Sequence, residues 1–579
     1  MTYSIFYSTK ALELFCGAVA ALALLLAWVV PQAGAHGFRA LEKAFAGLSK
    51  RTAAAATASA LLPMIFRLVL LPWFPIPQPH VHDEFSYLLL GDTLAHGRLA
   101  NPTPPLWEHF ETEYELMTPV YASQYQPAQG VFLAAGELIT GVPWWGVWLS
   151  CGLMCGAACW ALSGIVSRRW ALFGAVLMAF QIGVFGFWMN SYFGGAVSAV
   201  GGSFVFGSLT RLKRKRSRRT LHAITAGMGL VILLASRPAE ALIWMTFTAI
   251  WLFRDAPLRR AGIHTTLIVA CGVSALGVYN KAITGHAAEM PYSLYRDMYG
   301  TPQSYWWQAP VIISRFRTPE VAANYRDQLA LWRRRSSIAA LWDAEWRRLR
   351  DFWRFFIGPF STPALFLFPM VVRRRKTWPW LGLSAVLVLD HATYHAWYPQ
   401  QSGGETILIT WLLVECWRQL RATSRLRQRG LAATRLLMAG FACALLLLTF
   451  AIALQPGART LGGTAGRVLA AVLTQPGRRA QAIHRLEQIP GGHLVFVERR
   501  PGHPWYDEWV FNPADLSGSR IVFARMCSPE SDLRLVRALP HRTVWLANPD
   551  SDHPLKRMGA DASLNSSLAA IYGIGQIAR

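Results

Sequence analysis

Residues 17–30 read GAVAALALLLAWVV, and residues 436–454 read LLMAGFACALLLLTFAIAL. Neither run contains a charged residue, and the second approaches the ~20 apolar residues that a helix needs to cross a bilayer. Hydrophobic residues make up 53% of the 579 residues and charged residues only 15%, whereas soluble domains have roughly 45–50% and 25%. We therefore predict a polytopic α-helical membrane protein, and we exclude a disordered, collagen-like or disulfide-stapled chain.

The basic residues also indicate a membrane topology. The net charge is +25, from 57 Lys and Arg against 32 Asp and Glu. In a soluble protein this excess would suggest a nucleic-acid partner. Here the basic residues concentrate in short runs between apolar blocks, at 211–219, 373–376 and 418–429. Such runs mark cytoplasmic loops, so we expect membrane lipid as a partner and no nucleic acid.

The apolar blocks predict about twelve membrane helices. They lie at 11–30, 52–72, 144–165, 170–189, 196–210, 221–236, 240–254, 262–279, 353–373, 377–393, 404–418 and 433–454. The positive-inside rule places the Arg-rich loops in the cytoplasm, and the loops 73–143, 190–195, 237–239 and 394–403 outside, together with both termini. The predicted location is the cell inner membrane, with the external loops on the periplasmic side.

Two domains are expected. Residues 1–456 would form the transmembrane domain, which includes an external loop at 73–143 and an external segment at 280–352. Part of that segment, 319–352, combines tryptophans with arginines and predicts an amphipathic helix on the outer membrane surface. Residues 457–579 would form a small periplasmic α/β domain. Its elements are expected at 478–488 (helix), 493–498 (strand), 520–526 (strand), 529–539 (helix) and 543–547 (strand).

The external loop 73–143 carries the strongest candidates for chemistry. Asp83 and Glu84 are adjacent carboxylates just outside a membrane helix, and one could act as a general base while the other positions substrate or a cation. The alternative is an acidic helix N-terminus. The loop is too long and too aromatic for a plain connection, and its mixture of rings and polar groups suits a sugar site. We expect further substrate contacts from His82, Tyr87, Arg98, His109 and Glu111.

The order and sidedness of these segments resemble the GT-C superfamily of polyprenyl-phosphate-dependent glycosyltransferases, which includes protein O-mannosyltransferases and aminoarabinose transferases. Its members carry an Asp-Glu pair in the first large external loop, here Asp83 and Glu84. A Tyr-x-x-Pro-Pro stretch follows in the family, and Tyr125-Gln126-Pro127 keeps the Tyr and one Pro. The resemblance covers roughly residues 52–420.

Later positions extend the resemblance. Asn190, near Tyr192, stands where relatives often place a second external acid. Arg237 stands where they place a basic residue near the lipid phosphate, and His395 lies in a stretch that resembles their late His/Tyr/Pro loop.

The resemblance implies an inverting transfer of a sugar from a polyprenyl phosphate to a hydroxyl of an unidentified glycan, lipid or protein acceptor. Asp83 would be the base, and Glu84 would position it or hold a cation. No residue requires a metal, although a divalent cation is compatible with the acid pair. Two other functions stay open: a membrane anchor that presents the C-terminal domain without catalysis, and a transporter of lipid-linked solutes, which would favour internal repeats that the sequence lacks.

Overall fold

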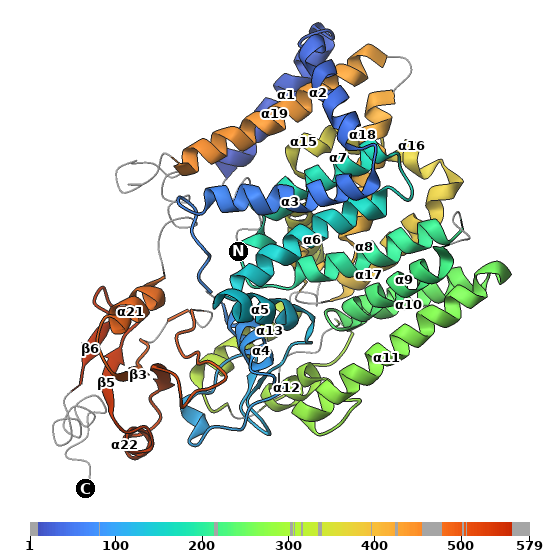
Figure 1. The fold of residues 1–579 in the computed structure, drawn as a ribbon. Coiled ribbons are helices and arrows are strands. Elements are labelled where there is room, and N and C mark those ends of the chain that lie inside the picture. Colours follow the sequence, from blue (N-terminus) through green and yellow to red (C-terminus); the bar gives the residue numbers. More distant parts are fainter. Residues whose placement is uncertain are drawn as a thin grey trace.

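The computed structural model describes residues 10–79, 81–213, 218–300, 305, 307–313, 316–333, 338–394, 397–422, 427–453, 477–500, 503–504 and 507–558. Most of this chain is helical, and a small sheet lies near the C-terminal end (Figure 1). His395, a predicted site residue, lies outside the described residues.

Among the described residues, five helices are long and apolar enough to cross a membrane. They span Lys10–Val29, Thr52–Leu70, Trp144–Leu162, Ala256–Thr284 and Gln428–Phe450. Three shorter apolar helices, Ala128–Thr140, Arg219–Leu234 and Pro238–Phe253, add to them. The chain is therefore a membrane protein with several spans, while the full number of about twelve stays a prediction.

A helix begins within or close to each predicted membrane segment. These helices are α1 (Lys10–Val29), α3 (Thr52–Leu70), α6 (Trp144–Leu162), α7 (Arg168–Met178), α8 (Gly195–Leu212), α9 (Arg219–Leu234), α10 (Pro238–Phe253), α11 (Arg259–Thr284), α15 (Gly358–Leu365), α16 (Phe368–Val372), α17 (Trp378–Thr393), α18 (Thr406–Ala422) and α19 (Arg427–Ala453). Figure 1 shows α3, α6, α8, α9 and α11 as a row of adjacent helices, while α1 packs on α19.

Two predicted spans are interrupted. The helix expected at 170–189 continues from α7 as a π-helical turn, Ala179–Val184, and a 3-10 turn, Phe187–Met189. The helix expected at 353–373 is divided into a π-helical turn, Trp353–Ile357, followed by α15 and α16. Proline accounts for the second interruption, because Pro359 and Pro369 cannot donate the backbone hydrogen bonds of a continuous helix.

Two segments expected as loops contain helices. The stretch 31–51, which was expected to be cytoplasmic, forms α2 (Ala35–Leu48). The stretch 73–143, which was expected to be external, forms α4 (His82–Ala95), a 3-10 turn (Trp107–His109), the antiparallel pair β1 (Glu115–Leu116) and β2 (Ala122–Ser123), and α5 (Ala128–Thr140). Helices α4 and α5 pack closely because Gly91 and Gly130 leave room: a Cβ on Gly91 would lie 2.6 Å from Leu133 Cβ.

The external segment 280–352 forms three helices, α12 (Pro291–Tyr299), α13 (Pro319–Arg333) and α14 (Ile338–Phe352). Helix α13 packs against the external stretch of the N-terminal half, where Asn324 Nδ2 donates to Glu113 Oε2 at 2.6 Å. Helix α14 exposes Trp342 and Trp346. The predicted single amphipathic helix at 319–352 is therefore two described helices, of which α14 keeps the exposed aromatic face.

The C-terminal region forms the predicted order of elements. Helix α21 (Arg478–Glu487) precedes β3 (Gly492–Val497), and β4 (Ile521–Arg525), α22 (Pro529–Ala538), β5 (Arg542–Ala547) and β6 (Leu555–Arg557) follow. The sheet order is β4-β3-β5-β6, parallel except for β6, a strand that the sequence analysis did not predict. Ser528 caps α22, whose first residue is Pro529.

The C-terminal sheet packs on the external stretch of the membrane domain. Leu89 of α4 and Phe110 and Tyr121 of the following stretch share one apolar cluster with Leu494 and Phe496 of β3. Figure 1 shows the sheet beside α4, α5 and α13. The two parts are therefore joined by a common core, which places the C-terminal sheet next to the predicted acid pair.

Candidate active site

Asp83 lies in the first turn of α4, next to a pair of stacked tyrosines. Tyr125 Oη donates a 2.5 Å hydrogen bond to Asp83 Oδ1. The Tyr125 ring stacks on Tyr87 of α4, with ring centroids 4.2 Å apart and planes inclined by 12°. Because Tyr87 is one turn after Asp83, α4 presents the carboxylate and the ring on one face. This contact fixes the orientation of the Asp83 carboxylate.

The surroundings of Asp83 change its acidity. Burial raises the pKa of Asp83 above its ordinary value, while the Tyr125 hydrogen bond and the charges of His82 and Arg237 oppose that rise. Burial also raises the pKa of Tyr87 to about 12 and that of Tyr125 well above its usual range. The tyrosines therefore stay protonated at neutral pH, and Tyr125 remains a hydrogen-bond donor to the carboxylate.

A small pocket opens beside this group. Its wall combines aromatic rings, amide groups and one guanidinium. The lining residues are Tyr87, Gln126, Gln129, Phe193, Gly194, Gly195, Ser236, Arg237 and Gln400. They come from α4, the start of α5, the 190–195 turn, the α9–α10 hairpin and the loop before α18. Segments that are distant in sequence thus meet at one site.

Arg237 supplies the positive charge of this pocket. It precedes α10, whose Pro238 begins the helix. Within the described part of the chain, no hydrogen bond or ion pair of its guanidinium is found, so the charge can serve an anionic ligand. Its charge also acts to lower the pKa of Asp83 and that of Tyr87. The cation and the carboxylate therefore belong to the same site.

Glu84 has a different role from Asp83. Its Oε1 accepts a hydrogen bond from Tyr192 N at 3.1 Å, and its Oε2 accepts one from Val81 N at 3.4 Å. It is 5% exposed. Glu84 therefore ties the start of α4 to the 190–195 turn, which lines the pocket, and it is placed to position Asp83 and Tyr192.

Asn190 is engaged by a buried arginine that the sequence analysis did not single out as a site residue. Arg67 Nε donates to Asn190 Oδ1 at 3.2 Å, and the Arg67 guanidinium also donates to Phe74 O and Pro75 O. Asn190 Nδ2 donates in turn to Gly186 O at 2.8 Å. Asn190 thereby holds the turn in shape, and its side chain does not line the pocket.

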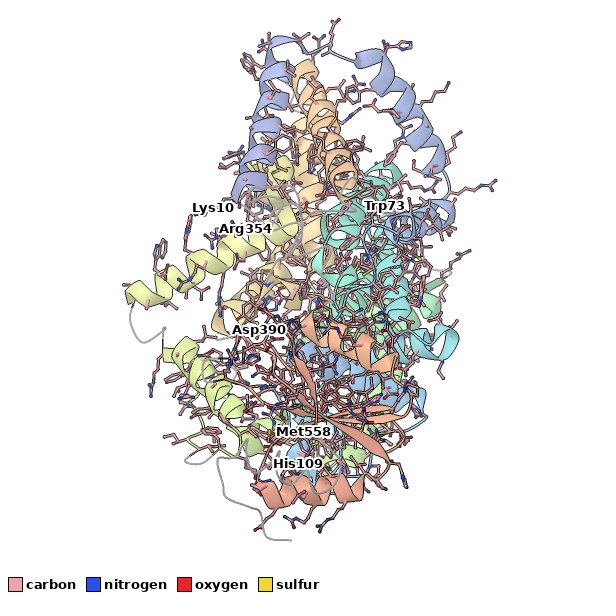
Figure 2. The ribbon with its side chains drawn as sticks, turned by 90° about the vertical axis from the view of Figure 1, so that its left-hand side faces the viewer. Lys10, Trp73, His109, Arg354, Asp390 and Met558 are labelled. Atoms are coloured by element: carbon pink, nitrogen blue, oxygen red, sulfur yellow. The ribbon has the colours of Figure 1, made fainter. Side chains whose placement is uncertain are left out.

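Three predicted substrate contacts face the C-terminal sheet instead. His82 Nε2 lies 3.1 Å from Glu508 Oε2, and His109 lies 2.8 Å from both Arg525 O and Ser531 Oγ. Glu111 O accepts from Arg525 Nε at 2.7 Å. Figure 2 shows His109 among the C-terminal elements, far from Asp390. These residues join the two parts of the chain and do not line the pocket.

Arg98 lies beyond the far end of α4, because the helix runs from His82 to Ala95 and its first turn carries Asp83. Its charge acts on Asp515 of the C-terminal region. Arg98 is therefore also outside the pocket lining. Of the predicted site residues, Tyr87 and Arg237 line the pocket.

Glu508 is the centre of the contact between the two parts. It is 2% exposed, and it pairs with Arg499, Arg525 and His82. Thr112 Oγ1 also donates to it at 2.8 Å. The pKa of Glu508 lies well below its ordinary value, because the attraction of the two arginines and the His82 hydrogen bond outweigh its burial. A buried carboxylate is thus kept ionised next to the first turn of α4.

A second cluster supports the loop that carries Gln400. His391 Nδ1 lies 3.1 Å from Glu405 and its Nε2 3.5 Å from Glu240, three residues after Arg237. Glu240 Oε2 accepts from Gly404 N at 3.1 Å, and Trp188 Nε1 donates to Gln400 O at 2.9 Å. These residues form no recognisable motif in the sequence, because they come from distant parts of the chain and the fold brings them together.

The described residues do not gather a set of metal ligands. No group of three or more His, Cys, Asp or Glu side chains that could hold a metal ion occurs among them. Glu84 already accepts two backbone hydrogen bonds, and an asparagine stands at position 190. The residues described around Asp83 do not fit a cation site, and the chemistry below uses no metal.

No protein-family model matches the chain, and no curated protein is detectably similar in sequence. Solved structures resemble it at low identity. ArnT from Cupriavidus metallidurans in the apo state is 12% identical, with a TM-score of 0.47, over 85% of this chain and 93% of that one. The same protein bound to undecaprenyl phosphate gives 13% and 0.43, over 84% and 92%.

The Archaeoglobus fulgidus oligosaccharyltransferase tethered with an acceptor peptide is 10% identical, with a TM-score of 0.42, over 76% of this chain. The chain spans 62% of the length of that protein. The function of this chain is therefore inferred from its own residues.

Proposed function

We propose that the chain is a membrane glycosyltransferase that moves a sugar from a polyprenyl phosphate to an acceptor hydroxyl, with Asp83 as the general base. One observation carries the proposal: a half-buried carboxylate, oriented by Tyr125, shares a site with a pocket lined by Arg237. A base and an unpaired cation at one pocket are what transfer from a phosphate leaving group needs. The motifs that resemble the GT-C superfamily agree with this chemistry.

The proposed transfer is a single displacement at the anomeric carbon. The acceptor oxygen forms a bond to the anomeric carbon while Asp83 takes the acceptor proton. The bond between the anomeric carbon and the phosphate oxygen breaks, and its electron pair leaves with the polyprenyl phosphate. Arg237 balances the charge on that phosphate. Attack from the side opposite the leaving group inverts the anomeric configuration.

The raised pKa of Asp83 favours this role. A carboxylate whose pKa is raised by burial is a stronger base than an exposed one, provided that it is ionised at the working pH. The Tyr125 hydrogen bond and the charge of Arg237 limit the rise in the pKa of Asp83. Glu84 contributes by fixing the turn at Tyr192. We place the site on the periplasmic face of the inner membrane, from the distribution of basic residues between loops.

The test is Asp83→Asn. The amide is nearly isosteric but cannot take the acceptor proton, so sugar transfer should fall by ~10²–10⁴-fold. The measurement is transfer of a labelled sugar from undecaprenyl phosphate in membranes of the cells that make the protein, at matched protein level. Asp343→Asn is the matched control, because Asp343 is exposed on α14 and its ion pair with Arg347 lies on the surface.

Glu84→Gln should be milder than Asp83→Asn, because a glutamine oxygen can still accept the Tyr192 hydrogen bond. If Asp83→Asn keeps near wild-type turnover, Asp83 is not the base. If the wild type transfers no polyprenyl-linked sugar in these membranes, the non-catalytic anchor takes the place of the enzyme.

A further inference from the structure

Two buried amide groups in the pocket wall each leave one polar atom without a hydrogen-bond partner among the described residues. Gln126 is 8% exposed and Gln129 is 3% exposed, and both line the pocket. Within the described residues, neither Gln126 Nε2 nor Gln129 Oε1 has a partner. Gln129 Nε2 donates to Tyr192 O at 3.0 Å, which fixes the orientation of that amide. The wall therefore offers one unused donor and one unused acceptor.

Such atoms indicate a ligand of matching chemistry. Burying a polar atom costs free energy if the atom loses its hydrogen bonds to water and gains no new partner. Native proteins therefore pair nearly all of their buried polar atoms. A hydroxyl group both donates and accepts, and can satisfy an amide N–H and an amide oxygen in turn. The rings of Tyr87 and Phe193 in the same wall offer flat apolar faces. Rings and amides together suit the face and the hydroxyls of a sugar.

The charges of the pocket-lining residues limit which class of sugar can bind. Arg237 is the one lining residue that carries a full charge at neutral pH, and none of the nine is a carboxylate, a lysine or a histidine. Its cation is needed for the phosphate, so a sugar carboxylate would have no second cation among the lining residues. A sugar amine would have no carboxylate among the lining residues, because Asp83 stands outside the lining and, in the proposed reaction, takes the acceptor proton. A charged sugar would be buried without a counter-charge.

We propose that the donor sugar is uncharged and hydroxyl-bearing, and that Gln126 and Gln129 recognise its hydroxyls. This inference rests on the proposed function, since it names the substrate class of the same pocket. It assigns a specificity role to the start of α5, where Pro127 ends the connection and Gln129 enters the helix.

The experiment measures binding, so that it needs no acceptor. The full-length protein in lipid nanodiscs is titrated with undecaprenyl phosphate, alone and carrying glucose or mannose, an amino-pentose, or glucuronic acid. The neutral donors should bind at least ~10-fold more tightly than both charged donors. Gln126→Met and Gln129→Met should each weaken the neutral donors by ~10-fold and leave the bare carrier unchanged.

Two controls separate the contributions. Gln481→Met, on the exposed face of α21, should change nothing. Arg237→Ala should weaken every ligand, including bare undecaprenyl phosphate, because it removes the phosphate contact. A methionine variant that no longer binds the bare carrier has lost its fold, and the wild-type donor panel then decides.

The outcomes are distinct. If the wild type binds the amino or the acidic donor as tightly as the neutral ones, the inference fails and the glycosyltransferase proposal stands. If both methionine variants bind neutral donors like wild type, water rather than sugar satisfies the amides and the inference fails. If the wild type binds neither the bare carrier nor any donor, the proposed function itself fails.

Discussion

The basicity of Asp83 depends on the hydroxyl of one residue, Tyr125. Its hydrogen bond to Asp83 Oδ1 stabilises the carboxylate and so lowers a pKa that burial raises. Tyr125→Phe removes that bond and keeps the ring that stacks on Tyr87. The pKa of Asp83 should therefore rise further, and the acidic limb of the pH profile of kcat/KM should move to higher pH.

The measurement is a pH series of sugar transfer for the wild type and Tyr125→Phe. A base must be ionised to act, so activity falls as pH drops through its pKa. Tyr305→Phe is a matched control, because Tyr305 donates to Asp390 and not to Asp83. An unchanged acidic limb in Tyr125→Phe would mean that this carboxylate does not set the pH dependence.

Single residues also show what a sequence can predict about a site. Asp83 and Tyr87 were predicted from an acid pair and a nearby ring, and Arg237 from the resemblance to the GT-C superfamily. Gln126 and Gln129 could not be recognised, because a glutamine becomes informative only when its burial and missing partner are known. His82 and His109 were grouped with the pocket for their chemistry, while their contacts lie with Glu508 and Ser531.

At the scale of elements, α4 carries Asp83 and also meets the C-terminal domain through His82. Glu508 holds that contact together with Arg499 and Arg525. Glu508→Gln would remove one of the two carboxylates that pair with these buried guanidinium groups, and Glu320 would remain as the other. Breaking a buried pair costs up to about 3–5 kcal/mol. We expect a lower midpoint of thermal unfolding in detergent, together with reduced sugar transfer although no pocket residue has changed.

The pH dependence of this effect has a definite sign. The pKa of Glu508 is lowered in the folded chain, so its contribution is complete above its ordinary value of 4.5 and is lost as pH falls through the lowered one. The difference in unfolding midpoint between the wild type and Glu508→Gln should thus shrink in acid. Asp552→Asn, in an exposed pair with Arg478, should leave the midpoint unchanged. Equal midpoints for Glu508→Gln and the wild type at neutral pH would contradict the role of Glu508.

Helices and strands were predictable where the pattern of apolar residues within the segment itself determines its structure. The strand at 493–498 and the helix at 529–539 follow from periodicity and from the Ser528-Pro529 start signal, and the structure has both. Helix α4 was expected only under the alternative interpretation of Asp83 and Glu84 as an acidic helix N-terminus, which the structure bears out. Helix α5 was missed although 128–140 is apolar, because the polar and aromatic residues before it predict a loop. Their pattern makes sense only once the C-terminal sheet covers α4.

At the scale of the whole molecule, the contact of the C-terminal domain with α4 constrains the topology. The first turn of α4 and the C-terminal sheet touch through His82 and Glu508, so they must lie on the same side of the membrane. The basic run at 211–219 and the run at 373–376 belong to the opposite side by the positive-inside rule. The site at Asp83 and the C-terminal domain should therefore both face away from the cytoplasm.

Cys527 makes this topology testable without a fusion. It is exposed in the C-terminal domain, whereas most of the other cysteines are buried. The pKa of its thiol is raised to about 11, because the side of the thiol that packs against the protein is desolvated and the nearby Asp532 disfavours the thiolate. Labelling is slow for that reason, and it should be run at pH 8, where the thiolate fraction is larger than at neutral pH.

A membrane-impermeant maleimide should then modify Cys527 in spheroplasts with an intact inner membrane. Cys527→Ser gives the background, and Lys376→Cys in that variant should react only after permeabilisation. Labelling of Cys527 only after permeabilisation would invert the topology, and the transfer reaction would then have to be placed on the cytoplasmic face.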